Sequence, residues 1–571
     1  MSAEAVGVDA GGADVLALHD HPLPRPLEMP SAVDIYDTTL RDGSQQEGLS
    51  LTVDDKLRVA EQLDHLGVAY IEGGWPGANP KDEEFFRRAP DELRLSTSTL
   101  VAFGSTRRPR AQAESDETLR LLLEAGTTAV CIVAKAWDYH VTEALRTDLD
   151  EAVRMAADSV AYLHRAGLRV FLDAEHFFDG YRHNPEFSLR VLRASEEAGA
   201  EVLVLCDTNG GTLPHEVERV LAEVLPATTV DVGVHFHNDG GCGVANTLAA
   251  VRLGAKQVQG CVNGYGERTG NADLCAAVPN LALKMGVRTI PPERLERLTP
   301  VAHHIAELVN IAPDPKQPYV GASAFAHKAG LHTSAIARAP DAYEHVVPDS
   351  VGNGTRFVVS ELSGRSTLQL KATELGLDME TPALTDVLQR LKHLEHQGYH
   401  FEVADGSLEL LMRDAGGWTQ PYFTLESFRV SVEHRASGEF TTEATVKIHA
   451  DGERIIRTAE GNGPVNALDG ALREAIGSKY PALAGLHLTD YKVRVLDTDR
   501  GTAAVTRVLL DTTNGERSWS TIGVSANIIE ASWQALSDSI VYGLLHSSPP
   551  DPSPADPSPA DPSPADENER A

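Results

Sequence analysis

A strand–helix alternation, repeated eight times between residue 33 and about residue 290, constrains the fold of this chain more than any other feature. In each repeat, about 30 residues long, an apolar and often β-branched run is followed by a segment with helical periodicity, and many of these segments end in glycine. The pattern predicts an α/β fold of the (β/α)8 TIM-barrel type. A doubly wound open sheet is the alternative, but no GxGxxG motif opens a helix after the first strand. The eight runs are VDIYDTTL, VAYIEGGW, LRLSTSTLVA, TAVCIVAK, LRVFLDAEHF, AEVLVLCDTNG, VDVGVHFHND and KQVQGCVNGYG.

Most of these runs begin apolar and end polar. In a TIM barrel the carboxyl ends of all the strands meet at one face, and active sites lie there. A single polar strand end is explained by a solvated loop, whereas several such ends predict a functional site. The polar ends are DTTLRDG, EGGWPG, DAEH, CDTNGG, HFHND and NGYGERTGN.

The rest of the chain divides by composition. We expect a disordered arm over residues 1–30, the barrel over 31–295 and helical linker subdomains over 296–415. Residues 416–546 change to alternating strands with two helices, and a strand–turn–strand–helix pattern with the turns DGER and NGER occurs twice. This predicts a C-terminal α+β domain made of two ββα units. Residues 547–571 repeat DPSPA without large apolar side chains, which is typical of a disordered tail.

The formal net charge of -33 argues against broad binding to nucleic acids or membrane surfaces, which need basic patches. No segment is apolar for long enough to span a membrane, and the first thirty residues lack a secretory signal. The five cysteines are odd in number and contain no CxxC motif, so a disulfide framework is not expected. These features predict a protein of the cytoplasm.

Two histidines with one residue between them stand out in the seventh run. His235 and His237 point to the same side of a strand, because side chains alternate with a period of two. They are either core residues or ligands of a metal ion. Neighbouring strand ends offer the oxygen atoms of Asp42 and Asn271, and this mixture of nitrogen and oxygen donors suits Mn, Fe, Co, Zn or a tolerant Mg site. No thiolate belongs to the set, which argues against a closed structural zinc site.

Three further polar residues at strand ends have two readings each. Arg41 either forms a surface ion pair or polarises a carbonyl beside a metal. Glu175 is either an inert carboxylate or an acid/base group, and Thr208 either caps the next helix or contacts a substrate. The residues alone leave these alternatives open.

Several of these motifs resemble the 2-isopropylmalate, homocitrate and citramalate synthase family, over residues 33 to 545. The resemblance implies a TIM-barrel enzyme that condenses acetyl-CoA with a 2-oxo acid. Two further stretches resemble the long-form citramalate synthases, which implies pyruvate as the 2-oxo acid, citramalate as the product and a route to isoleucine. The alternatives are a larger 2-oxo acid, an acyl-CoA lyase and a non-enzymatic amino-acid sensor. The family motifs are DTTLRDGSQQEG, HFHNDGGCGVANTLAAVRLGA and NGYGERTGNADL, and the two stretches are YIEGGWPGANPKDEEFF and VFLDAEHFFDGYRHNPEF.

The resemblance also implies roles for single residues. A divalent cation (Mn, Mg, Co or Zn) would be held by Asp42, His235, His237 and Asn271, with Arg41 on the keto oxygen and Thr208 on the carboxylate of the 2-oxo acid. Glu175, His332 and Tyr343 match acid/base positions, and the last two come from the partner subunit in the family, which implies a homodimer. The C-terminal domain resembles a regulatory domain, for which isoleucine is the implied effector. A dimerisation domain without an effector site is the alternative.

The chain departs from the family pattern at two positions. Asp173 stands where some citramalate synthases have a bulky aromatic residue that narrows the keto-acid pocket, and Lys328 stands where related synthases commonly have an acid. Trp75 on the second strand end either supplies the missing bulk or packs on a helix. These residues therefore do not determine the size of the keto-acid pocket.

Overall fold

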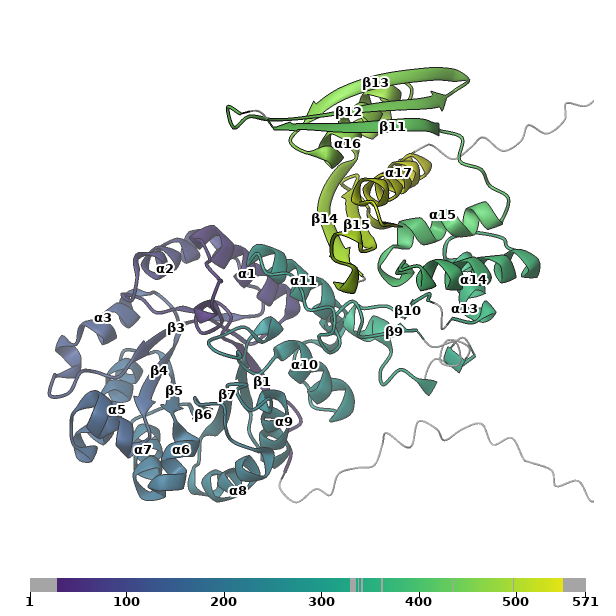
Figure 1. Cartoon of the computed structure of the whole chain (residues 1–571). Coiled ribbons are helices and arrows are strands. Elements are labelled where there is room, and N and C mark those ends of the chain that lie inside the picture. Colours follow the sequence, from purple (N-terminus) through teal and green to yellow (C-terminus); the bar gives the residue numbers. More distant parts are fainter. Residues whose placement is uncertain are drawn as a thin grey trace, which may run out of the picture. The chain divides into compact units, whose positions relative to one another are not determined.

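The computed structural model describes residues 28–328, 335–336, 338–339, 342–360, 363–434, 436–496 and 498–547. The chain forms two compact units (Figure 1). The first comprises the described residues up to Ala326 together with Glu344–Arg356, and the second comprises the remainder. Most of the expected N-terminal arm and all but the first residue of the expected tail lie outside the described residues, so both stay predictions.

Eight parallel strands in sequential order close into a barrel in the first unit, which confirms the predicted TIM barrel (Figure 1). The barrel closes where β1 pairs in parallel with β8. The strands are β1 (Asp34–Asp37), β2 (Tyr70–Gly74), β3 (Thr99–Ser105), β4 (Ala129–Lys135), β5 (Arg169–Glu175), β6 (Val202–Asp207), β7 (Asp231–Phe236) and β8 (Gln257–Gly260). The helices of this unit are α1 (Val53–Leu66), α2 (Pro80–Glu92), α3 (Glu117–Glu124), α4 (Asp138–His140), α5 (Leu149–Arg165), α6 (Phe177–His183), α7 (Pro185–Glu197), α8 (Pro214–Val224), α9 (Gly243–Leu253), α10 (Leu274–Pro279) and α11 (Leu298–Leu308).

Local signals in the sequence set the ends of these helices. At α1, the Thr52 side chain accepts from the Asp55 backbone N–H while the Asp55 side chain accepts from the Thr52 backbone N–H, which forms a capping box. The helix ends at Leu66 and is capped by Gly67, whose φ of 93° lies in the left-handed region that favours glycine. An amphipathic segment between two such signals forms a helix of defined length that covers the barrel with its apolar face.

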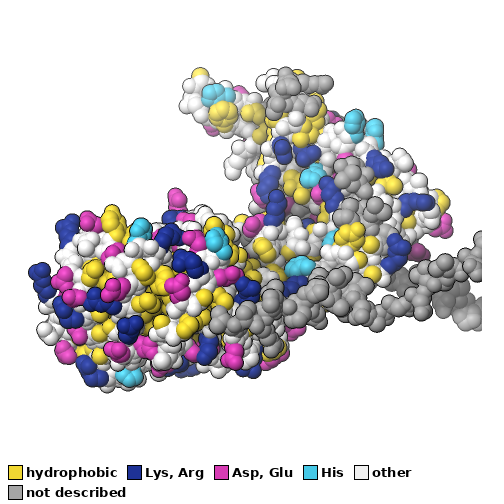
Figure 2. Space-filling view, turned by 90° about the horizontal axis from the view of Figure 1, so that it is seen from below, with side chains coloured by type: hydrophobic (Ala, Val, Ile, Leu, Met, Phe, Trp, Pro, Cys, Tyr) yellow, Lys and Arg dark blue, Asp and Glu magenta, His cyan; other side chains and the backbone are white. Residues whose placement is uncertain are grey.

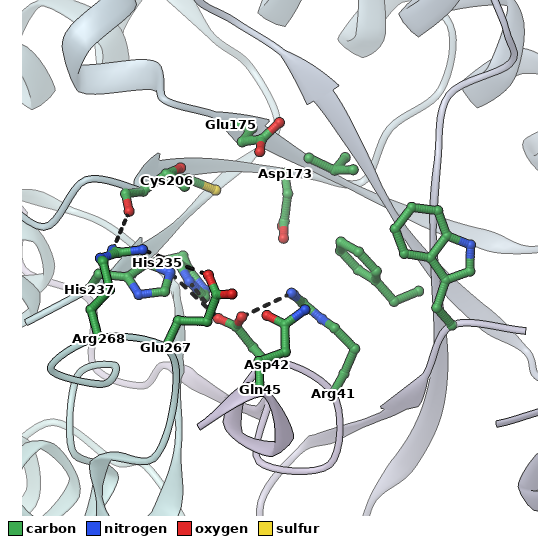
Figure 3. A pocket seen from close by; sticks show the side chains of 14 residues that line it. Arg41, Asp42, Gln45, Asp173, Glu175, Cys206, His235, His237, Glu267 and Arg268 are labelled. Atoms are coloured by element: carbon green, nitrogen blue, oxygen red, sulfur yellow. Dashed lines mark hydrogen bonds and ion pairs between the residues drawn. The ribbon is translucent and has the colours of Figure 1, made fainter. Parts of the chain in front are cut away.

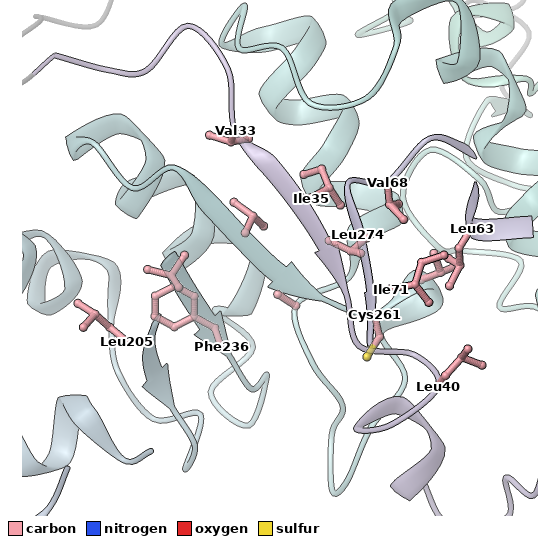
Figure 4. Close-up of a cluster of buried hydrophobic side chains, with 14 of the residues drawn as sticks. Val33, Ile35, Leu40, Leu63, Val68, Ile71, Leu205, Phe236, Cys261 and Leu274 are labelled. Carbon is pink, nitrogen blue, oxygen red and sulfur yellow. The ribbon is translucent and has the colours of Figure 1, made fainter. Parts of the chain in front are cut away.

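Alternation along the strands separates two hydrophobic clusters. Residues such as Ile35 and Ile71 face outward and pack against the helices, as part of this cluster shows in Figure 4. Their neighbours Tyr36, Tyr70 and Phe171 face inward and form the floor of the barrel, where the Tyr70 and Phe171 ring centroids lie 5.0 Å apart. The inner cluster is therefore a packed core, and the polar ends of the strands lie above it.

The second unit contains a helical part and a repeated α+β part. The helices are α13 (Arg365–Glu374), α14 (Thr381–His396) and α15 (Asp405–Ala415). The repeat consists of β11 (Thr424–His434), β12 (Phe440–Ala450), β13 (Glu453–Gly461) and α16 (Pro464–Ile476), followed by β14 (His487–Val495), β15 (Thr506–Thr513), β16 (Ser518–Ser525) and α17 (Ile528–Ser547). Two short strands, β9 (Ala326–His327) and β10 (Arg356–Phe357), pair where the chain passes between the units.

The internal repeat differs from the predicted ββα units by one strand. Each copy of the repeat is a three-stranded antiparallel sheet followed by a helix. The third strand is β11, which pairs with the β12–β13 hairpin, or β14, which pairs with the β15–β16 hairpin. β11 contains the alternating run FRVSVEH and β14 contains the first part of the run KVRVLD, which the sequence marks as strands. Most of their side chains are exposed, so the sequence pattern did not show that each of them joins a hairpin. The hairpin turn itself follows the sequence: Asp451 and Gly452 have φ values of 51° and 74°, as a two-residue turn between twisted strands requires.

The surface is mixed in charge. Figure 2 shows basic side chains interspersed with acidic and apolar ones over the barrel unit. Within the described residues, no helix combines the length and the apolar character that crossing a membrane requires.

We predict that Phe171→Ala destabilises the barrel by about 3–5 kcal/mol, because removal of a fully buried ring leaves a cavity in the inner cluster. Urea unfolding followed by circular dichroism would measure the loss. Leu488→Ala, at a side chain that is 44% exposed on β14, is the control and is expected to change the free energy of unfolding by less than about 0.5 kcal/mol. Equal effects of the two substitutions would contradict the assignment of Phe171 to a packed floor.

Candidate active site

The polar strand ends enclose a cavity of about 270 Å³ at the carboxyl-terminal face of the barrel (Figure 3). The cavity therefore lies at the strand ends, where the change from apolar to polar residues predicted a functional site. Its lining comes from β3 to β7 and from the segments that follow β1, β2, β6, β7 and β8: Arg41, Asp42, Gln45, Trp75, Phe103, Val133, Asp173, Glu175, Cys206, Thr208, His235, His237, Glu267 and Arg268.

Three predicted metal ligands meet in this cavity. Asp42, His235 and His237 are buried, and one ligand atom of each lies within 4.8 Å of the others. The Asp42 Oδ2 atom lies 3.3 Å from His235 Nε2 and 3.6 Å from His237 Nε2. Figure 3 shows the three side chains pointing toward one another. Asn271 forms a backbone bridge with His237 and is itself 1% exposed, so the fourth predicted ligand adjoins His237, and it lines a neighbouring cavity.

The charges of this group are strongly perturbed. Burial alone would raise the pKa of Asp42, but the Arg41 guanidinium and the two imidazoles hold it well below its usual range. Burial and the neighbouring His235 lower the pKa of His237 to about 4. Burial would also lower the pKa of His235, but contact with Asp42 raises it. At neutral pH the site therefore contains an ionised carboxylate and a neutral His237, which are the protonation states that a metal ligand needs.

Unsatisfied polar atoms indicate that the group fits a cation. Asp42 Oδ2, His237 Nδ1 and Asn271 Oδ1 are buried and have no hydrogen-bond partner among the residues that the structure describes. Buried polar atoms without partners are uncommon and costly, and two of these three are oxygen acceptors that a divalent cation would satisfy. The Asn271 amide is already oriented, because its Nδ2 donates to the Tyr265 carbonyl at 3.0 Å and leaves Oδ1 free.

Arg41 is held rigidly beside this group. Its Nε donates to the Glu72 carboxylate, and its Nη1 lies 3.2 Å from Asp42 Oδ1. The guanidinium also lies 3.8 Å above the centre of the Phe103 ring. Glu72 is fully buried and accepts from the Tyr36 hydroxyl at 2.6 Å. Sequence reasoning missed Glu72, although an acid inside the apolar run YIEGG was a usable signal.

Glu175 and Thr208 also line the cavity, and their roles in it stay predictions. The Lys135 ammonium at the end of β4 forms an ion pair with the Glu175 carboxylate, and this lysine was not singled out from the sequence. The Thr208 Oγ1 atom accepts from the His176 backbone N–H at 2.9 Å, which leaves the hydroxyl hydrogen free to donate. The Thr208 carbonyl accepts from Arg268 at 2.7 Å.

Two predicted acid/base residues, His332 and Tyr343, are not placed in the cavity by the described structure. His332 lies outside the described residues, and Tyr343 is an exposed residue of the second unit. Both roles stay predictions. Lys328 forms an ion pair with Glu402 within the second unit. Trp75 lines the cavity and its ring lies edge-on to Phe103, with centroids 5.6 Å apart.

Comparison with known proteins gives a consistent picture along the chain. Residues 32–303 match the HMGL-like family, residues 319–399 the homocitrate synthase post-HMGL domain-like family, and residues 402–544 the LeuA allosteric (dimerisation) domain. The (R)-citramalate synthase of Streptomyces coelicolor is 53% identical over 91% of this chain and 98% of that protein. The (R)-citramalate synthase of Sulfolobus acidocaldarius is 44% identical over 90% and 97%. A probable 2-isopropylmalate synthase of Methanopyrus kandleri is 33% identical over 89% and 97%.

We predict that His235→Ala weakens binding of Mn²⁺ by more than about 100-fold while the barrel stays folded, because the change removes one of four clustered donors at the rim of the core. Titration of the metal-stripped protein, with free Mn²⁺ followed by its EPR signal, measures the affinity, and circular dichroism checks the fold. His65→Ala, at an exposed position of α1, is the matched control. Unchanged Mn²⁺ binding by the His235 variant would rule out the ligand assignment.

Proposed function

The chain belongs to the family of the (R)-citramalate synthases and 2-isopropylmalate synthases, and on this premise we propose that it condenses acetyl-CoA with pyruvate to give citramalate and CoA. The (R)-citramalate synthases of Streptomyces coelicolor and Sulfolobus acidocaldarius are 53% and 44% identical to this chain, against 33% for the probable 2-isopropylmalate synthase, and this difference favours the smaller 2-oxo acid. The observation that carries the proposal is the cavity itself, in which a buried set of metal-binding donors, an arginine and a carboxylate face one space of about 270 Å³.

A divalent cation would be held by the Asp42 carboxylate, the two imidazoles and the Asn271 amide oxygen. When bound, such a cation supplies Lewis-acid polarisation of a keto oxygen. The mixed nitrogen and oxygen donors fit Mn, Co, Zn or Mg and do not select among them.

Arg41 is the residue that stabilises negative charge as it develops on the keto oxygen of pyruvate. Its guanidinium is already fixed by Glu72, Asp42 and the Phe103 ring, so no reorganisation is needed when the charge appears. Thr208 donates its free hydroxyl hydrogen to the carboxylate of the substrate. Its oxygen is held by the His176 backbone N–H, which fixes the direction of that donation.

Glu175 is the group that removes a methyl proton from acetyl-CoA. The Lys135 ammonium forms an ion pair with its carboxylate, which holds this group at the wall of the cavity. The enolate carbon then forms a bond to C2 of pyruvate, and the C2 oxygen takes the negative charge that Arg41 stabilises. The proton that Glu175 removed is returned to this oxygen, which gives the hydroxyl group of the product. In the hydrolysis, the oxygen of water forms a bond to the thioester carbon as the C–S bond breaks, and a proton from water goes to the sulfur of the departing CoA.

The cavity has one aromatic and aliphatic wall, made by Trp75, Phe103 and Val133. This wall limits the space beyond the methyl group of pyruvate, where a 2-oxo acid with a branched side chain would need room. Trp75 thereby supplies bulk that the acid at position 173 lacks.

The second unit supports a role in assembly and control. Because residues 402–544 match an allosteric dimerisation domain, we propose a homodimer in which His332 and Tyr343 complete the acid/base machinery of the partner's cavity. Isoleucine is the proposed effector of this domain.

The proposed substrate is tested by release of free CoA from acetyl-CoA with a panel of 2-oxo acids. Pyruvate is expected to give the highest kcat/KM. The kcat/KM values for 2-oxobutyrate and 2-oxoisovalerate are expected to be lower than that for pyruvate, by about 10- to 200-fold for each added methylene that meets the aromatic wall. A preference for 2-oxoisovalerate would refute the assignment. CoA release without any 2-oxo acid would indicate thioester hydrolysis instead.

Glu175→Gln is expected to lower kcat by about 10²- to 10⁴-fold, because the amide cannot accept the proton, while Mn²⁺ affinity stays as in the unaltered protein. Steady-state kinetics and Mn²⁺ titration measure the two quantities. Glu201→Gln, which breaks only an exposed ion pair with Arg169, is the control and is expected to retain full activity. Full activity of the Glu175 variant would exclude its role as the base.

A further inference from the structure

A line of buried hydrogen bonds lies behind one of the two imidazoles. The Gln259 Nε2 atom donates to Asp173 Oδ1 at 3.0 Å, and the Gln259 Oε1 atom lies 3.0 Å from His235 Nδ1. Gln259 is 0% exposed, Asp173 4% and His235 5%, so solvent does not compete for these contacts. The three side chains come from β5, β8 and β7 and all point into the barrel.

The order of these contacts fixes the direction of each hydrogen bond. The Asp173 oxygen accepts, so the Gln259 amide must turn its nitrogen toward Asp173 and its oxygen toward His235. An amide oxygen can only accept, and His235 Nδ1 therefore carries a hydrogen. The lone pair of the neutral ring is then left on Nε2, which is the atom that faces Asp42 Oδ2 at 3.3 Å.

Backbone pairing makes this arrangement rigid. His235 and Gln259 are direct register partners in the parallel pair of β7 and β8. Gln257, two residues earlier on the same strand, also points inward, but both of its amide atoms lack a hydrogen-bond partner among the described residues. His237 Nδ1 likewise has no partner there. Of the two inward-facing glutamines of β8 and the two imidazoles, only Gln259 and His235 contact each other in this way within the described residues.

We propose that Asp173 and Gln259 are positioning residues, which hold the His235 ring with its Nε2 lone pair directed at the cation site. This inference rests on the proposed function, in which His235 is a metal ligand. It also explains why an acid occupies position 173, since an aromatic side chain there offers no carboxylate to accept from the Gln259 amide. Partners behind a metal-binding histidine commonly fix its tautomer and contribute to metal affinity.

The test measures the Kd of Mn²⁺ for the full-length, metal-stripped protein by the EPR signal of free Mn²⁺. Gln259→Leu is expected to raise the Kd by about 10- to 100-fold, because the ring loses its acceptor. Gln257→Leu is the matched control on the same strand, and it is expected to leave the Kd unchanged. Asp173→Leu is expected to weaken Mn²⁺ binding, whereas Asp173→Asn keeps an oxygen that accepts from Gln259 and is expected to restore it to within about threefold.

Thermal unfolding of the metal-free proteins separates positioning from general stability. A merely structural role predicts a lower Tm for Gln259→Leu with an unchanged Kd, and that result would overturn the proposal. If Gln259→Leu does not fold, Gln259→Asn, which withdraws the amide by one methylene, takes its place with the same two outcomes. Failure of the proposed function gives a different result: the unaltered protein would bind no Mn²⁺, or His235→Ala would bind it as tightly as the unaltered protein.

Discussion

The pairing of β1 with β8 closes the barrel, and the site depends on the register of that pair. Asp34 to Asp37 align with Gln257 to Gly260, and the Thr38 backbone N–H continues the ladder to the Gly260 carbonyl at 2.8 Å. The turn that follows is held by N–H groups of Arg41 and Gly43, which both donate to the Thr38 carbonyl. Residues from the first strand end are thereby placed beside residues of the seventh and eighth strands, more than 190 positions later in the chain.

A second constraint is the cost of buried charge. The Arg41 guanidinium lies among the carboxylates of Asp42 and Glu72, and an unpaired cation in that place would cost several kcal/mol. Burial raises the pKa of Glu72, although Arg41 acts in the opposite direction, and burial likewise raises the pKa of Asp173. Buried aromatic rings pack below these groups, and burial strengthens the electrostatic interactions among them. The donors are already in place before a substrate arrives.

Strand alternation explains which site residues could be predicted from the sequence. The spacing of His235 and His237 and the polar residues after the first and eighth strands were sufficient to propose a shared metal site. Gln259 and Glu72 are also inward-facing by the same alternation, each two residues after another inward side chain. They were missed because a glutamine or a glutamate within a strand has many roles. The hydrogen-bond partner of such a side chain depends on which strand lies next to it and on the register between the two strands.

The sequence by itself determined the strand–helix alternation, the capping of the helices, the side of each strand that faces inward and the family to which the chain belongs. These properties follow from local periodicity, from single-residue conformational preferences and from motifs of adjacent residues. Only the tertiary structure decided that Glu72 holds Arg41, that Lys135 pairs with Glu175 and that Asp173 reaches His235 through Gln259. Those contacts join residues on different strands, and their identity depends on the register with which eight strands close into one barrel.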